Sequence, residues 1–373
     1  RCYFYYLYHA IGNEAYFSIV DSLLELSKEH IAIVLYAPPL SEKLAKYAES
    51  FGEQITLEYW SNVMLYNLHE NDIPLIKRYS TCIKKRQDIL SLMINSNISS
   101  AISSEDKVSI LVELVGSGDW DKMQNKAYNI ACLLNTIDLP TDKEQKNFIF
   151  LIELMMSESL KDFMQDNTLL LEKEIQSSPE VMMQLMSLTY LSDDKIAHKQ
   201  GTESNASYGA DEIKISLAGL HFFEHYNLMP GLQSDKSIDY QILNAYIDNL
   251  QELAKVYQRV EITPYVIGKI IGKIPEGNDY PSTEMCALIE KLNNDKVDGE
   301  INCAIFNKQG ATIRSRFSGG EIERKRIETF KLFRDRALGK SPRMVKILSD
   351  LIRSYEQRAE MEDLQAERNK LRS

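Results

Sequence analysis

Apolar residues recur at helical spacing along most of this chain, and that spacing restricts the possible folds more than any single motif does. Side chains three and four positions apart share one face of an α-helix. The pattern predicts amphipathic helices of roughly 12 to 20 residues that are joined by short polar loops. Clear examples are Tyr16, Ile19, Val20 and Leu23, and further along Val108, Leu111, Val112 and Val115.

Helix start signals follow one another at short intervals. Ser41 and Ser178 each stand just before an apolar-periodic run, where a serine side chain can accept a hydrogen bond from a backbone amide of the first turn. The segment around Gly118-Asp119-Trp120 resembles the turn and helix of a tetratricopeptide-like unit, although no repeat of fixed length is present. We therefore predict an all-α fold, an irregular helical-repeat (TPR/HEAT-like) superhelical array with one β-hairpin near the C-terminus.

The predicted hairpin lies in a stretch where the helical pattern gives way to alternation. Ile301, Cys303 and Ile305 alternate with polar or small residues, turn residues follow over 307–310, and alternation resumes with Arg314 and Arg316. The methionines of the runs 151–160 and 181–190 are expected in the core, with an adaptable binding surface as the alternative.

Composition and periodicity divide the chain into four segments. A helical-hairpin array is expected over 1–191, and a flexible surface loop over 192–212, which is rich in Ser, Gly and Asp and has no apolar period. A helical subdomain follows over 213–300. The last segment, 301–373, contains the hairpin and a two-helix basic tail.

Charge is unevenly distributed along the chain. The whole sequence has a net charge of -11, yet residues 301–373 contain 17 Lys and Arg against 10 Asp and Glu. A basic tail on an acidic chain can dock on its own acidic body or can bind an anionic partner such as a nucleic acid. Both interpretations remain open from the sequence.

The spacing of the cysteines and the length of the apolar runs indicate in which cellular compartment the protein is expected. Five cysteines stand far apart without a paired spacing, which favours free thiols in a reducing cytoplasm over a disulfide or zinc framework. No window approaches the ~18 uninterrupted apolar residues that a membrane span needs. We expect a cytoplasmic protein with no membrane contact, and the absence of an initiator methionine suggests part of a longer chain.

Two adjacent glycines, Gly319 and Gly320, precede the first helix of the tail. Ser318 with Glu321 matches the capping box, in which the serine oxygen accepts the amide hydrogen bond of the glutamate three positions on. The alternative is an anion- or partner-binding site at the helix N-terminus. That site would comprise Arg314, Arg316, Gly319, Gly320, Arg324 and Lys325.

The run HFFEH, His221 to His225, fits the H-x-x-E-H template of inverted zinc proteases. Two histidines four apart share a helix face, but a zinc enzyme also needs a third ligand and a pocket. The stronger interpretation places both histidines at the edge of an amphipathic helix. No other catalytic motif is present, so we expect no catalytic residue, no metal and no cofactor in this segment.

The tail contains a spaced set of residues that runs from the expected hairpin into its last helix: Gly310, Arg314, Gly319, Gly320, Glu323, Arg324, Pro342, Arg343, Tyr355, Ala359 and Asp363. With this set the tail resembles the C-terminal region of a group of large, mostly uncharacterised multidomain bacterial proteins. The resemblance covers roughly 178–370 and implies a helical array behind a separate N-terminal effector part, an organisation similar to that of antiviral sensors. It implies a non-catalytic protein-binding, sensor or scaffold module, whose partner is a phage protein or its own N-terminal domain, with oligomer formation as a further expectation.

Overall fold

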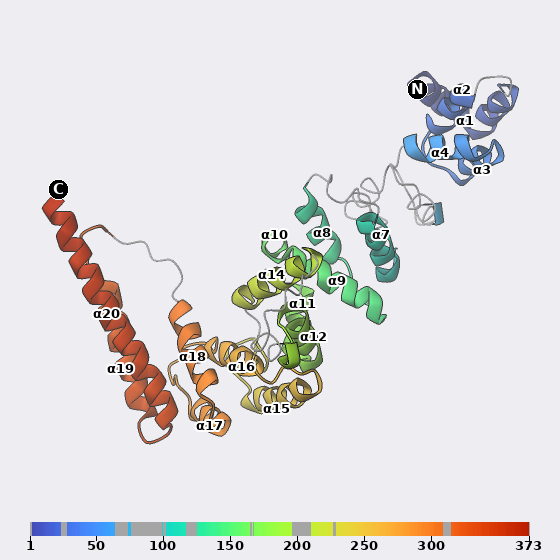
Figure 1. Ribbon diagram of the computed structural model, residues 1–373. Coiled ribbons are helices and arrows are strands. Elements are labelled where there is room, and N and C mark those ends of the chain that lie inside the picture. Colours follow the sequence, from blue (N-terminus) through green and yellow to red (C-terminus); the bar gives the residue numbers. More distant parts are fainter. Residues whose placement is uncertain are drawn as a thin grey trace. The chain divides into compact units, whose positions relative to one another are not determined.

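The computed structural model describes residues 2–23, 28–63, 74–75, 99, 102–116, 125–164, 166, 168–195, 210–226, 229–308 and 315–372. Within these ranges every extended element is a helix (Figure 1). β-Structure in the described part of the chain is limited to isolated bridges, one at Pro39 and one antiparallel bridge between Leu232 and Ile238. The expected all-α class is therefore confirmed for the described residues.

The chain divides into two compact units, residues 1–170 and 171–373. In the first unit, α2 packs against α1, α3 and α4, and α9 packs against α7 and α10. The helices of this unit are α1 (Cys2–Ser22), α2 (Lys28–Tyr36), α3 (Glu42–Ser50), α4 (Glu53–Asn62), α7 (Ser104–Gly116), α8 (Lys126–Leu134), α9 (Lys143–Met155) and α10 (Ser157–Lys161).

The second unit is a succession of helices, most of which pack on near neighbours in the chain. Its helices are α11 (Leu170–Ser177), α12 (Pro179–Thr189), α14 (Ala210–His225), α15 (Tyr240–Val256), α16 (Thr263–Gly272), α17 (Thr283–Leu292), α18 (Asp295–Asn307), α19 (Glu321–Ala337) and α20 (Pro342–Arg372). Helix α12 packs against α14 and α15, α16 against α18, and α20 against α17, α18 and α19.

Several local predictions are confirmed. The side chain of Ser41 caps α3 by accepting the amide hydrogen of Leu44, and Ser178 caps α12 in the same way through Val181. Met182, Met183 and Met186 of α12 are fully buried, as expected for core residues, whereas Met155 at the end of α9 is 43% exposed, so the expectation is wrong for that methionine. The tetratricopeptide-like turn over 117–124 lies outside the described residues, as does 196–209 of the expected loop.

The predicted β-hairpin is wrong where the structure describes it. Ile301 and Ile305 are buried on one face of α18 together with Val297, whereas Cys303 is exposed on the other side. The same letters fit a helical period of four as well as a strand period of two, and packing against α16 and α20 selects the helix. Residues 309–314 of the predicted hairpin lie outside the described residues, and 315–317, where the second strand was expected to continue, form a turn and no strand.

Close approach of α16 and α18 depends on two glycines one turn apart. A Cβ atom at Gly268 would lie 2.7 Å from the carbonyl oxygen of Val297, and one at Gly272 would overlap the side chain of Ala304. Because neither glycine has a side chain, the two helices can pack almost backbone to backbone. This contact supports the part of α18 on which α20 rests.

No helix in the described part of the chain combines the length and the apolar character needed to cross a membrane.

Candidate functional site

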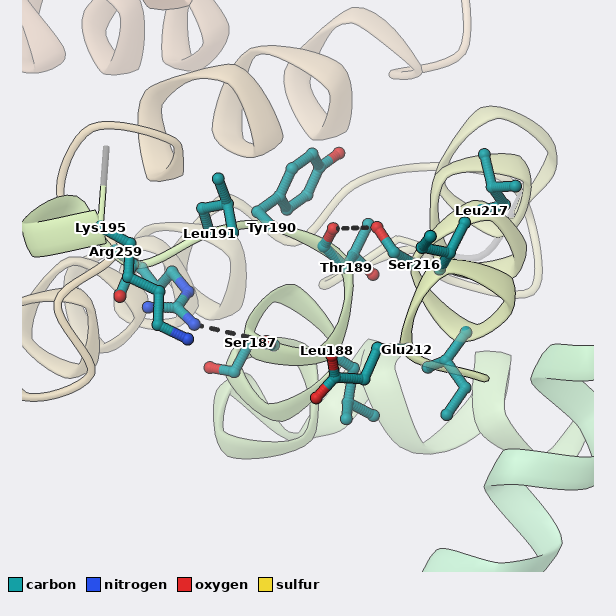
Figure 2. A pocket seen from close by; sticks show the side chains of 13 residues that line it. Ser187, Leu188, Thr189, Tyr190, Leu191, Lys195, Glu212, Ser216, Leu217 and Arg259 are labelled. Atoms are coloured by element: carbon teal, nitrogen blue, oxygen red, sulfur yellow. Dashed lines mark hydrogen bonds between the residues drawn. The ribbon is translucent and has the colours of Figure 1, made fainter. Parts of the chain in front are cut away.

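A groove lies between the C-terminal end of α12 and the first half of α14 (Figure 2). Its volume is about 390 Å³, within the ~300–1,000 Å³ usual for ligand sites. Its wall contains aliphatic side chains that are exposed despite their size: Leu188 at 53%, Ile213 at 48% and Leu217 at 60%. The groove therefore offers apolar surface that nothing in the described chain covers.

The two helices that form the groove are joined closely at its base. The hydroxyl of Ser216 donates to the carbonyl oxygen of Thr189 at 2.7 Å. Gly219 faces the Thr189 side chain so tightly that no Cβ atom fits between them. The groove walls are thus held by α12–α14 packing and do not depend on a ligand.

Sequence reasoning missed this groove. Leu188 follows the methionine run of α12, and Leu217 lies on α14 before the two histidines, so the two are distant in sequence. Period analysis assigns aliphatic residues of this kind to the core. Only the packing of α14 on α12 shows that their side chains remain exposed.

The start of α19 differs from the predicted capping box. The N-cap is Gly320, with no side-chain cap, and the Ser318 hydroxyl donates to the carbonyl oxygen of Ser315 at 3.0 Å. Gly319 has a φ of +54°, in the left-handed region that glycine enters without strain. The chain enters α19 through this backbone turn, which turns the serine away from the helix end.

The carboxylate of Asp363, on α20, binds the start of α19. The amide of Gly320 donates to Asp363 Oδ1 at 2.9 Å, and the Arg324 guanidinium forms an ion pair with the same carboxylate. The amide hydrogen bond, and then Arg324, lower the pKa of Asp363 below its usual range. The predicted anion site at this helix N-terminus thus holds an anion from the protein itself.

The glycine pair is explained by the closeness of α20. A Cβ atom at Gly320 would lie 2.5 Å from the carbonyl oxygen of Ala359, and one at Gly319 would overlap the Asp363 carboxylate. Glu323 is buried, with Arg358 Nε 3.6 Å from its carboxylate, and Tyr355 is buried against Phe330. The motif residues of α19 and α20 therefore meet in one helix–helix interface.

Several basic residues of the tail face carboxylates. Lys325 pairs with Glu321 at 2.9 Å, and Arg326 pairs with Glu276 at 3.1 Å. Arg316 is exposed, and Arg314 lies outside the described residues. The structure thus brings Gly319, Gly320 and Arg324 together around Asp363, while Lys325 pairs within its own helix.

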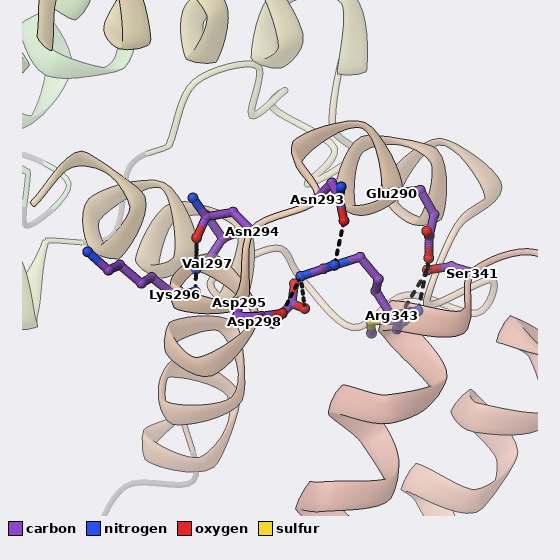
Figure 3. A network of polar contacts seen from close by, with 10 residues as sticks. Glu290, Asn293, Asn294, Asp295, Lys296, Val297, Asp298, Ser341 and Arg343 are labelled. Atoms are coloured by element: carbon purple, nitrogen blue, oxygen red, sulfur yellow. Dashed lines mark hydrogen bonds and ion pairs between the residues drawn. The ribbon is translucent and has the colours of Figure 1, made fainter. Parts of the chain in front are cut away.

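A second polar contact joins the tail to the preceding helices (Figure 3). The guanidinium of Arg343, at the start of α20, lies 2.8 Å from Asp295 and 2.7 Å from Asp298. Glu290 accepts hydrogen bonds from the Ser341 hydroxyl at 2.6 Å and from the Arg343 amide at 2.9 Å, which lower its pKa. The basic tail therefore docks on acidic residues of its own unit, as one of the two charge interpretations predicted.

The two histidines of the HFFEH run lie on α14 with stacked rings, their centroids 4.2 Å apart. The described residues contain no group of three or more His, Cys, Asp or Glu side chains placed to hold a metal ion. In the described chain, a third ligand for the zinc-protease template is therefore missing.

A scan against protein-family models, a search of curated proteins and a search of solved structures find no match.

Proposed function

We propose that this chain is a non-catalytic module that binds a protein partner and acts as a sensor or scaffold within a larger bacterial protein. The observation that carries the proposal is the α12–α14 groove, where Leu188, Ile213 and Leu217 expose aliphatic surface on a preformed wall. Exposed apolar surface of this kind, gathered in a concave site, is typical of interaction sites.

The helical architecture supports the same proposal. Helices that pack mainly on near neighbours, as in residues 171–373, build extended surfaces without a central catalytic cleft, and we propose an irregular superhelical array. The resemblance of the tail to multidomain bacterial proteins adds an antiviral-sensor role with a phage protein, or an N-terminal domain of the same protein, as partner. Both points support the proposal by analogy with the domain organisation of other proteins.

Nucleic-acid binding is the weaker proposal because the tail is partly neutralised. Arg324, Arg326 and Arg343 each face a carboxylate of the same unit, and each such pair reduces the charge that a phosphate backbone would meet. A protein partner that contacts the apolar groove can bind without breaking these ion pairs.

The test compares the proteins that copurify with the whole chain and with a groove variant. Leu188→Asp places a charge in the groove, while Leu332→Asp changes a leucine on α19 that is similarly exposed, at 61%. We expect quantitative mass spectrometry to show a protein that is retained by the wild type and by Leu332→Asp and lost from Leu188→Asp. The same set of proteins on all three would contradict the proposed function.

A further inference from the structure

Arg259 lies at one end of the α12–α14 groove and is only 9% exposed. Its Nη1 donates to the carbonyl oxygens of Tyr257 and Gln258, both at 3.0 Å, and its Nη2 donates to that of Ser187 at 3.3 Å. Its Nε is buried and has no hydrogen-bond partner in the described chain, and no carboxylate there forms an ion pair with this guanidinium. The three hydrogen bonds of this buried guanidinium thus all go to backbone carbonyl oxygens.

The nearest carboxylates do not neutralise it. Asp193 accepts hydrogen bonds from the backbone amides of Val260 and Glu261, at 2.8 and 3.3 Å. Burial lowers the pKa of Arg259, although Asp193 and Asp194 act in the opposite direction. A buried charge without a paired counter-charge is costly, so this end of the groove favours an incoming anion.

A second cation lies at the same end. Figure 2 shows Lys195 beside Arg259, with Leu217 at the opposite end of the groove. Lys195 is exposed, and Glu212 is the one carboxylate among the described residues that line the groove. The groove therefore combines an apolar wall with a cationic end.

We propose that this groove binds a peptide segment of a partner protein in which aliphatic side chains stand next to one Asp or Glu. The aliphatic side chains cover Leu188, Ile213 and Leu217, and the carboxylate pairs with Arg259 and Lys195. Opposite charge selects the direction of the segment, because reversal would place the carboxylate against leucine. The inference rests on the proposed function and specifies the chemistry of the partner.

The test is selection of a yeast-displayed library of random dodecapeptides on the whole chain. We expect enriched sequences that contain neighbouring aliphatic residues and one acidic residue. A synthetic peptide of the enriched sequence, and its Glu→Gln or Asp→Asn form, then serve as probes in fluorescence anisotropy. The loss of the carboxylate is expected to weaken binding by about tenfold or more.

Two variants that change only exposed side chains locate the site, each with a matched control. We expect Lys195→Glu and Leu217→Ser to weaken binding of the acidic peptide, and Lys340→Glu and Leu332→Ser to leave it unchanged. Lys195→Glu should leave the affinity of the neutral peptide nearly unchanged, which a loss of folding would not do.

The inference is overturned if the library yields no enriched peptide, if the enriched sequences lack an acidic residue, or if groove and control variants bind alike. Failure of the proposed function gives a different result: the set of proteins that copurify with the chain would then be the same for the wild type and for Leu188→Asp. If the enriched peptides are neutral and their binding is still weakened by Leu217→Ser, the proposed pairing with Arg259 and Lys195 is refuted, while the proposed protein-binding function of the groove is not.

Discussion

Replacement of Gly320 by alanine tests whether the glycine pair serves helix packing. The new methyl group would lie 2.5 Å from the carbonyl oxygen and 2.6 Å from the Cα atom of Ala359, whereas ordinary contacts are 3.4–4 Å. Helix α20 must therefore move by about 1 Å, or the turn before α19 must rearrange. Overpacking of this kind costs about 1–3 kcal/mol. Because Gly320 has a φ of -83°, no backbone strain contributes.

The same substitution at Gly299 is the matched control. Gly299 lies within α18, and a Cβ atom built there has no neighbour within 4 Å. Gly→Ala in a helix interior is expected to stabilise by about 0.5–1 kcal/mol, so the two variants should shift stability in opposite directions.

Urea unfolding followed by two spectroscopic signals can report on the two units of the chain separately. Both tryptophans, Trp60 and Trp120, precede residue 171, so tryptophan fluorescence follows the first unit, while far-UV circular dichroism follows both. In urea unfolding, Gly320→Ala should lower the midpoint of the circular-dichroism transition of the second unit and leave the fluorescence transition unchanged. Equal effects of Gly320→Ala and Gly299→Ala would refute the reasoning.

Three further outcomes follow from the described contacts. Arg343→Lys should destabilise the second unit by about 1–3 kcal/mol in urea unfolding, because a lysine cannot reproduce the guanidinium contacts with Asp298 and its neighbours; no change would contradict the assigned contact. Gly268→Ala should also destabilise it, by about 1–3 kcal/mol, and a stabilised variant would mean that α16 and α18 are further apart than described. Metal analysis of the purified chain should give substoichiometric zinc, whereas one zinc per chain, lost with His221→Ala, would support the protease template.

The helices were predictable because apolar period and caps agree along most of the chain. Ser41 and Ser178 cap helices where their position in the sequence indicates. The hairpin prediction was wrong because the spacing of Ile301 and Ile305 fits both the strand period and the helical period over so short a run. Only the burial of Val297 on the same face distinguishes the helix from the strand. Tertiary packing decided between two local patterns of similar quality.

The candidate sites were less predictable because they depend on distant pairs. The glycine pair, Arg324 and Asp363 were all named from the sequence as residues of the resemblance. Asp363 is 43 positions after Gly320, however, and nothing in that spacing indicates that its carboxylate binds the glycine amide. Nothing in the sequence singles out Arg259, since its guanidinium binds the carbonyl oxygen of Ser187 on α12, 72 positions earlier. Sequence spacing indicates which groups are present, and packing determines which of them meet.

The identity of the anion at the start of α19 can be measured directly, by NMR titration of the Asp363 carboxyl carbon with and without inorganic phosphate. The resonance is assigned by its loss in Asp363→Asn. A folded-state pKa below the unfolded value means that this carboxylate stabilises the fold above the unfolded pKa, and that the contribution is lost as pH falls through the folded value. We predict a pKa below 3.8 that phosphate does not change. A pKa at or above 3.8, or one that rises as phosphate displaces the carboxylate, would contradict the account.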